Sequence, residues 1–124
     1  AFDASGVLLL PGCADAFGPK AIRASAGAIL HVPIVNVTAN DLLGRTLYAA
    51  DAAGEKIDPP SRDAILVFGN EGAGVSEEIL LASRRIAIPM SSRVESLNVA
   101  SSAAILLSRT FRSAAAKPPL SNLV

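Results

Sequence analysis

The chain has 124 residues, which suffice for one hydrophobic core but not for two ordinary ones, so we expect a single domain. Eleven basic and eleven acidic side chains cancel, so the overall charge does not indicate a polyanionic partner. One cysteine and one histidine exclude an intrachain disulfide and leave no cluster of metal ligands, so we expect no metal and a reducing, cytoplasmic environment. No apolar run approaches the roughly 20 residues that cross a bilayer, so we expect no membrane association.

The first part of the chain predicts a strand, a helix and a second strand. Residues 6–10 form a short apolar run that ends at a Pro-Gly turn, as in a buried strand. Pro19 is suited to the first turn of a helix, which we expect to continue to Gly27. The apolar residues 28–35 predict the second strand, with Pro33 tolerated near an edge or an end.

The middle of the chain continues this alternation. Residues 38–43 predict a short helix, which the glycine after them would end. Residues 45–51 predict a third strand, and the Asp-Ala-Ala-Gly sequence at 51–54 is typical of a turn. We expect an exposed loop at 56–63, where two prolines are adjacent, and residues 65–68 show the clearest strand pattern.

The last part predicts two helices separated by a fifth strand. Ser76 is placed to cap a helix that runs to about residue 84, and a strand at 85–90 and a polar loop at 91–95 follow. From Leu97, apolar residues recur at helical spacing to about residue 112, with Ser96 as the cap. Because strands and helices alternate, we expect an α/β fold with a mostly parallel sheet flanked by helices.

Residues 68–76, Phe-Gly-Asn-Glu-Gly-Ala-Gly-Val-Ser, connect a predicted strand to a predicted helix through three glycines. Glycine permits unusual backbone angles and the close approach of a ligand. The glycine order is the reverse of the dinucleotide-binding order, and the Gly-Lys-Ser or Gly-Lys-Thr of a phosphate-binding loop does not occur. The alternative is a tight strand-to-helix turn with Glu71 facing water.

A second loop, within residues 86–105, follows the next predicted strand and enters the last helix through Ser-Leu-Asn. Parallel sheets bind ligands beyond the carboxyl ends of their strands, where both loops are expected to lie. The alternative is that Ser96 only caps the helix and Asn98 only points to solvent.

Two stretches, residues 66–76 and 88–100, resemble signatures of a known protein family. Leu-Val-Phe-Gly-Asn-Glu-Gly-Ala-Gly-Val-Ser resembles the second signature of the SpoU, or TrmH, branch of the SPOUT methyltransferases. Ile-Pro-Met-x-x-x-x-Glu-Ser-Leu-Asn-Val-Ala resembles the third signature of that family. We therefore expect residues 1–112 to form a SpoU-type methyltransferase domain, followed by a tail at 113–124.

The resemblance implies a C-terminal deep trefoil knot, an exception to the rule that chains do not thread loops. It also implies a homodimer that binds S-adenosylmethionine in the knotted crevice and transfers the methyl group to a ribose 2'-hydroxyl of tRNA or rRNA. RNA is thus the expected partner. A sulfonium donor is already reactive, so the main task of the protein would be to hold the 2'-oxygen in line with the methyl carbon.

The family's site residues are carried over by position. Those implied to contact or adjoin the donor, largely through backbone groups around the adenosine, are Gly69, Ile88, Leu97, Ala49, Ala50 and Met90. The polar active-site positions, implied to orient the acceptor nucleotide and the methionine part of the donor, are Glu71, Ser96 and Asn98.

Some positions depart from the family pattern. Its first signature, Asn-x-Gly-x-x-x-Arg, is absent before residues 6–10, so we expect this chain to lack the first part of the catalytic domain. Arg23 is no substitute, because it follows the first strand instead of preceding it, and we expect it to be a solvated helix residue. Ser92 stands where the family commonly has glycine in the loop.

Two other functions compete with the enzyme. If the complete polypeptide lacks the first signature, the chain would be a catalytically incompetent knotted module for dimerisation or RNA binding. An oxidoreductase with a nucleotide cofactor has much weaker support, because the glycine order is reversed and no acidic residue closes the next strand.

Overall fold

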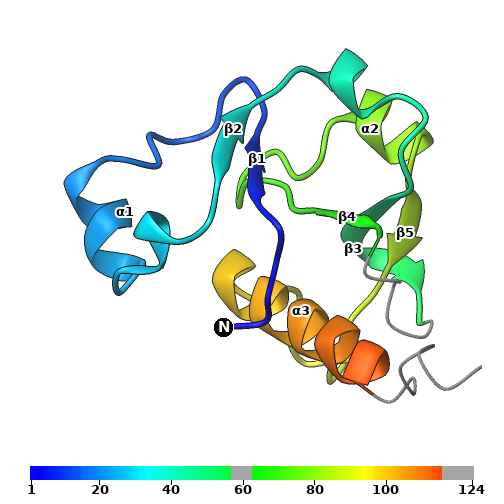
Figure 1. Cartoon of the computed structure of the whole chain (residues 1–124). Coiled ribbons are helices and arrows are strands. Elements are labelled where there is room, and N and C mark those ends of the chain that lie inside the picture. Colours follow the sequence, from blue (N-terminus) through cyan, green and yellow to red (C-terminus); the bar gives the residue numbers. More distant parts are fainter. Residues whose placement is uncertain (57–62, 116–124) are drawn as a thin grey trace, which may run out of the picture. The chain divides into compact units, whose positions relative to one another are not determined.

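The structure, a computed structural model, describes residues 1–56 and 63–115 (Figure 1). The chain divides into two compact units, formed mainly by Asp3–Leu43 and by Gly44–Val124. In each unit the strands pair in parallel, and helices lie between β1 and β2 and between β4 and β5, which confirms the α/β class. Most of the loop predicted at 56–63 and most of the tail predicted at 113–124 lie outside the described residues.

The first unit is a two-stranded parallel sheet with a helical connection. β1 (Val7–Leu9) pairs with β2 (Ile34–Asn36). Between them lie α1 (Pro19–Ala24), with proline in its first turn as predicted, and a 3-10 helix (Ala28–Leu30). Arg23 is exposed on α1, in agreement with its expected place on a solvated helix.

The strand predicted over residues 28–35 is wrong for residues 28–33. Those residues begin with the 3-10 helix, and β2 starts only at Ile34, directly after Pro33. Gly27 has a left-handed conformation, with φ of 87°, which turns the chain into the 3-10 helix. Pro33 has no N–H for a ladder, although its carbonyl oxygen accepts a bond from Val7 N at 2.8 Å. An apolar run by itself does not distinguish a strand from a short helical turn.

The short helix predicted at 38–43 is a 3-10 helix, Ala39–Leu42, whose start is fixed by Thr38 and Asp41. The backbone N and the Oγ1 of Thr38 each donate to Asp41 Oδ2 at 2.7 Å. These bonds, that of the backbone N–H first, lower the pKa of the Asp41 carboxyl.

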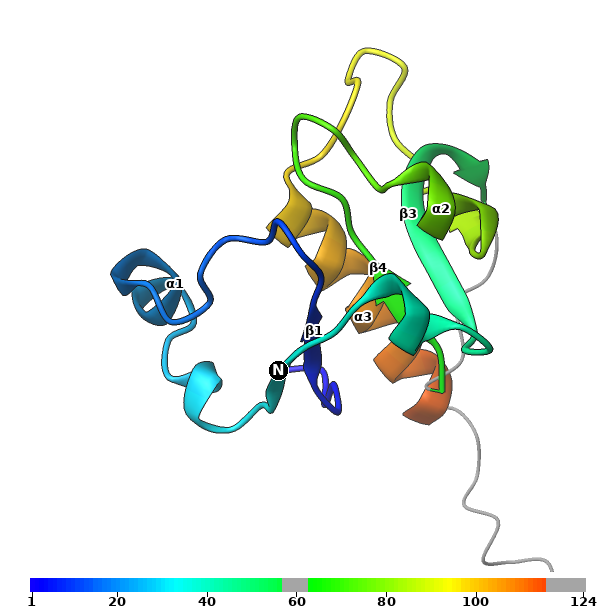
Figure 2. The ribbon, with the colours of Figure 1, turned by 90° about the horizontal axis from the view of Figure 1, so that it is seen from above.

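β3 (Leu47–Glu55) is the central strand of the second unit (Figure 2). It pairs in parallel with β4 (Ile65–Val67) on one side and with β5 (Arg84–Ile86) on the other. α2 (Glu77–Leu81) connects β4 to β5, and α3 (Val99–Ala115) follows β5. The buried apolar side chains of this unit are Leu47, Ala49, Val67, Ile79, Ile86, Ala87 and Leu106.

β3 does not end at Asp51, where a turn was predicted, but continues to Glu55. The Asp-Ala-Ala-Gly stretch forms a register shift in the ladder, and residues on both sides of it pair with Ile86. Asp51 Oδ1 accepts a bond from Ala53 N at 2.8 Å, and the Glu55 carbonyl oxygen accepts one from Ala87 N at 2.9 Å. The turn residues therefore form a bulge, because β5 supplies a pairing partner before and after them.

α2 and β5 are both shorter than predicted. α2 ends at Leu81 instead of near Arg84, and β5 spans only Arg84–Ile86. Residues 87–90, predicted as strand, leave the sheet. Pro89 lies in this stretch and has no N–H to donate to a ladder.

The helix caps also differ from the prediction. Ser76 occupies the N-cap of α2, but its side chain makes no capping bond. α3 is capped by Asn98 instead of Ser96, since Asn98 Oδ1 accepts bonds from Ala100 N at 2.8 Å and Ser101 N at 3.3 Å. An amide directly before the first helical residue reaches N–H groups that a hydroxyl two positions earlier does not.

α3 continues to Ala115, beyond its predicted end near residue 112. The helix is confirmed, but the apolar stripe predicted from Ala100, Ala103, Ala104 and Leu107 is displaced: Ala100 and Ala104 are exposed, and the buried residue is Leu106. Within residues 1–56 and 63–115, no helix is both long enough and apolar enough to cross a membrane.

Asn98→Ala should lower the free energy of unfolding by about 1 kcal/mol, because two backbone N–H groups of α3 lose their acceptor. Urea denaturation followed by far-UV circular dichroism measures the change. Ser96→Ala is the matched control, since the Ser96 side chain has no hydrogen bond within the described residues. An equal loss in both variants would contradict the assignment of the cap.

Gly54→Ala should destabilise the protein by about 1–3 kcal/mol, because a Cβ at this position would lie 2.7 Å from the backbone of Arg85 and of Ile86. Backbone atoms in a strand pair cannot move aside without breaking the pairing. Gly72→Ala is the control, because the nearest atom there, Asn70 Oδ1, would be 3.8 Å away. Thermal melts of both variants test the prediction, which fails if Gly54→Ala melts at the parent's temperature.

Candidate functional site

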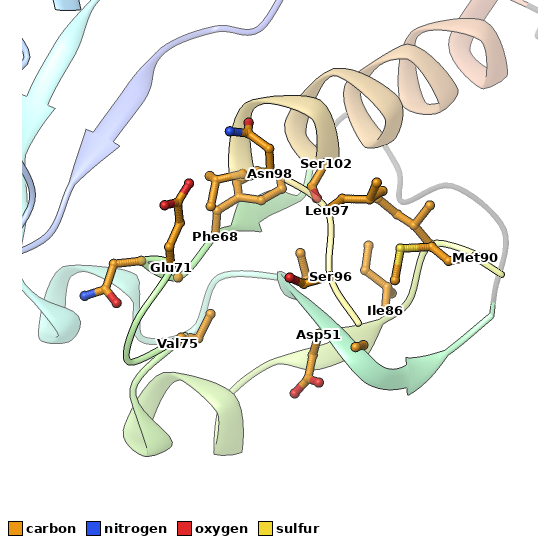
Figure 3. A pocket seen from close by; sticks show the side chains of 17 residues that line it. Asp51, Phe68, Glu71, Val75, Ile86, Met90, Ser96, Leu97, Asn98 and Ser102 are labelled. Carbon is orange, nitrogen blue, oxygen red and sulfur yellow. The ribbon is translucent and has the colours of Figure 1, made fainter. Parts of the chain in front are cut away.

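A cavity of about 390 Å³ lies at the carboxyl ends of β4 and β5, beside the middle of β3 (Figure 3). Its lining comes from residues 50–52 of β3, the loop after β4 at 68–75, and the chain from β5 into α3 at 86–102. This volume is within the range of small-molecule sites, and the carboxyl ends of parallel strands are where such sites occur. The first unit has a separate hollow of about 470 Å³, which contains none of the predicted site residues.

The glycine loop is a compact hairpin held by its own hydrogen bonds. Asn70 Oδ1 accepts a bond from Gly72 N at 3.0 Å, and the Asn70 carbonyl oxygen accepts one from Gly74 N, also at 3.0 Å. Gly69 has to be glycine, because a Cβ there would overlap the backbone of Gly74 and Val75. The loop is therefore a tight turn with Glu71 exposed, as one alternative predicted, and it also forms part of the cavity wall.

The structure brings together all but one of the predicted site residues. Those that line the cavity are Ala50, Gly69, Glu71, Ile88, Met90, Ser96, Leu97 and Asn98. Ala49 does not line it, because its side chain is fully buried inside the sheet, with an exposure of 0%. The register shift that begins after Ala50 interrupts the regular alternation of side chains, so Ala50, Asp51 and Ala52 all line the cavity whereas Ala49 stays in the core.

The three polar positions have different surroundings. Glu71 and Ser96 are exposed, and neither has a hydrogen-bond partner within the described residues. Asn98 is held at its carbonyl oxygen by the cap of α3, so the suggestion that it only points to solvent is wrong. Figure 3 shows Glu71 on the glycine loop, whereas Ser96 and Asn98 come from the segment that enters α3.

Sequence reasoning missed several residues of the cavity wall, including Asp51, Phe68 and Ser102. Asp51 was assigned to a turn, and only its pairing with β5 places it here. Phe68 was read as the end of a strand, and Ser102 as a position within a helix. Their side-chain directions follow from the register of the sheet and of α3, for which the sequence offers no separate signal.

Asp51 is the most firmly held polar group of the cavity. Its Oδ2 accepts bonds from Arg85 Nη2 at 2.6 Å and Nε at 2.9 Å, and its Oδ1 accepts the bond from Ala53 N. The Ala53 N–H and then the Arg85 guanidinium hold the pKa of Asp51 below its ordinary value. The carboxylate therefore stays ionised at neutral pH.

The charged side chains that line the cavity are all negative. Asp51 and Glu71 are acidic, and no Lys, Arg or His is among the described residues that line the cavity. A polyphosphate would meet repulsion without compensation in such a site. The apolar side chains of Phe68, Ile88 and Leu97 line the same cavity. The cavity therefore suits a ligand with an apolar surface and a neutral or positive charge.

Asp51→Asn should reduce the dependence of the free energy of unfolding on pH in the acidic range. A carboxyl whose pKa is lowered by folding stabilises the protein above the unfolded-state pKa of about 3.9 and loses that contribution as the pH falls through the folded-state pKa. The variant should thus be less stable by about 1 kcal/mol at pH 7, and this difference should shrink as the pH falls through the folded-state pKa of Asp51. Urea denaturation between pH 2 and 7 measures this, and a constant difference over that range would contradict the role of ionisation.

Comparison with known proteins identifies the family. The model of the SpoU rRNA Methylase family matches residues 1–108. The 23S rRNA (guanosine(2553)-2'-O)-methyltransferase RlmP of Bacillus subtilis (strain 168) is 35% identical over 118 residues, 85% of this chain and 48% of the relative. The 23S rRNA (adenosine(1067)-2'-O)-methyltransferase of Streptomyces laurentii is 33% identical over 130 residues, 95% of this chain and 48% of the relative. The chain thus spans about half the length of these relatives.

Solved structures agree with the sequence comparison. The AdoMet-bound rRNA methyltransferase from Sinorhizobium meliloti is 29% identical and has a TM-score of 0.81, over 90% of this chain and 47% of that one. The SpoU methyltransferase AviRb from Streptomyces viridochromogenes, in complex with the cofactor AdoMet, is 26% identical with a TM-score of 0.79, over 94% of this chain and 50% of that one. The family match covers most of the sequence and includes both signature loops, and the chain therefore belongs to the SpoU rRNA methylase family.

Proposed function

We propose that the protein transfers the methyl group of S-adenosylmethionine to a ribose 2'-hydroxyl of ribosomal or transfer RNA. The observation that carries this proposal is the cavity, which both signature loops line at the carboxyl ends of the parallel strands. Family membership supports the reaction, since relatives of this family are named 2'-O-methyltransferases of 23S rRNA. Two structural neighbours hold AdoMet, which supports the donor.

The lining residues fit such a donor. The apolar side chains of Ile88, Met90 and Leu97 offer a surface for the adenosine. Gly69 and Ala50 leave backbone groups accessible, because neither has a side chain larger than a methyl group. Ala49, which is fully buried, would support the adjacent wall without touching the donor. When bound, S-adenosylmethionine supplies a methyl carbon activated by a sulfonium.

Glu71, Ser96 and Asn98 would orient the acceptor ribose and the methionine part of the donor. The cap bonds engage the carbonyl oxygen of Asn98 and so fix the direction of its side chain. Glu71 and Ser96 are exposed at the cavity and have no competing partners within the described residues. Groups held in place before the reactants bind lower the cost of bringing an oxygen in line with the methyl carbon.

Family membership supports four further features of the proposal. We propose that residues 1–112 act as one methyltransferase domain, with 113–124 as a tail. The C-terminal part forms the trefoil knot, and the functional unit is a homodimer. The protein acts in the cytoplasm, on RNA.

Calorimetric titration with S-adenosylhomocysteine tests the donor site. The parent should bind saturably, and Leu97→Asp should weaken binding at least tenfold, because it places a charge in an apolar wall. Leu81→Asp is the matched control, since Leu81 lies on α2, is 83% exposed and does not line the cavity. Equal binding by both variants would place the donor elsewhere.

Mass spectrometry of nucleosides from ribosomal and transfer RNA incubated with the protein and S-adenosylmethionine tests the reaction. A 2'-O-methyl nucleoside that forms only with active protein is the expected result. Donor binding without any methylated nucleoside would instead favour the non-catalytic knotted module. No binding by folded protein would contradict the proposed function as a whole.

A further inference from the structure

We propose that Asp51 makes the cavity selective for the positively charged methyl donor over the uncharged product that remains after transfer. The inference rests on the proposed function and assigns a role to a residue outside both signatures. It follows from three features: the sign of the lining charges, the placement of Asp51 but not of Arg85 at the cavity, and the change of charge in the reaction.

Asp51 lies at the cavity with its side chain 22% exposed. A charge in a site of reduced hydration acts more strongly on a ligand than one in open solvent, and salt screens it less. Glu71 has the same sign and lines the same cavity, but it stands on an exposed loop. Asp51 is therefore the carboxylate whose charge is fixed in position by surrounding bonds.

Arg85, the ion-pair partner of Asp51, does not line the cavity. Arg85 belongs to β5, has a side chain 48% exposed and is not among the cavity residues. The negative member of the pair therefore belongs to the cavity lining, whereas the positive member does not and is about half exposed. This arrangement keeps the carboxylate ionised and leaves a net attraction for a cation in the cavity.

The proposed reaction changes the charge of the bound ligand by one unit. The bond between sulfur and the methyl carbon breaks and its electron pair stays on sulfur, while the methyl carbon bonds to the ribose 2'-oxygen and the hydroxyl proton is released. S-adenosylmethionine has a net charge of about +1 at neutral pH, and S-adenosylhomocysteine has none, because only the former carries a sulfonium. An anionic wall thus attracts the donor and gives no such attraction to the product, which favours exchange after each turnover.

A second ion pair on the same strands provides a matched control. Glu55 of β3 pairs with Arg84 of β5 at 3.1 Å, with side-chain exposures of 66% and 56%. Neither residue lines the cavity. Glu55→Gln therefore removes one negative charge and one β3–β5 ion pair, as Asp51→Asn does, without altering the cavity wall.

The test compares two probes by calorimetry. Sinefungin carries a charged amine near the position of the sulfonium, whereas S-adenosylhomocysteine is neutral there. We expect the ratio of their affinities, sinefungin over S-adenosylhomocysteine, to fall about three- to tenfold in Asp51→Asn, the size expected for one charge acting over several ångströms at a partly hydrated site. In Glu55→Gln the ratio should stay within about twofold of the parent.

Arg85→Gln should change the affinity ratio in the opposite direction. Removing the guanidinium leaves Asp51 unneutralised, so the affinity ratio should rise above that of the parent. Structural damage alone would move the ratio in the same direction in both variants, and thermal melts confirm that each is folded.

An unchanged ratio in Asp51→Asn, or a shift of equal sign in Asp51→Asn and Arg85→Gln, would overturn the inference while leaving donor binding intact. If the parent binds neither probe, the proposed function fails, and this inference fails with it. Should Asp51→Asn not fold, a ratio in Arg85→Gln that does not rise above the parent's is sufficient to overturn the inference.

Discussion

The pairing of β5 with β3 is the constraint on which the second unit depends. β5 has only three residues, yet Ile86 pairs with β3 on both sides of the bulge at residues 51–54. Gly54 makes this possible, because any side chain there would meet the backbone of β5. The pairing places the carboxyl ends of the strands together and sends the chain after β5 along the cavity toward α3. Without it, neither Asp51 nor the Ser-Leu-Asn segment would reach the glycine loop.

The conformations of the two loops that form the cavity are fixed by different contacts. The glycine loop is held by bonds from Asn70 and by the close approach of Gly69 to Gly74, so it keeps its shape through its own contacts. The segment before α3 is anchored at its end by Asn98. A cavity whose walls are fixed by internal bonds can position a ligand with little loss of conformational freedom on binding. A rigid cavity of this kind suits a reaction in which the positioning of the reactants contributes more than proton transfer.

Several residues serve the fold and the site together. Asn98 caps α3 and lines the cavity, while Asp51 stabilises the bulge and joins β3 to β5 from the same wall. Changes at these positions will therefore affect both stability and binding, and the two effects separate only with controls such as Ser96 and Glu55. The chain spans about half the length of these relatives.

The sequence by itself determined the α/β class, the family and eight of the seventeen residues that line the cavity, because these depend on local patterns: apolar runs, glycine spacing and the two signatures. It also predicted that Gly69 and Asn98 belong to the site. It misjudged residues 28–33, which form a local 3-10 helix and turn, residues 51–54, whose conformation depends on pairing with β5, and residues 87–90, which follow β5 without strand structure. Only the tertiary structure decided that the Asp-Ala-Ala-Gly stretch is a bulge, that Ala49 is buried while Asp51 faces the cavity, and that Asn98 caps α3. The reason is that strand register is set by contacts between strands, and a shift of one residue moves a side chain to the other face.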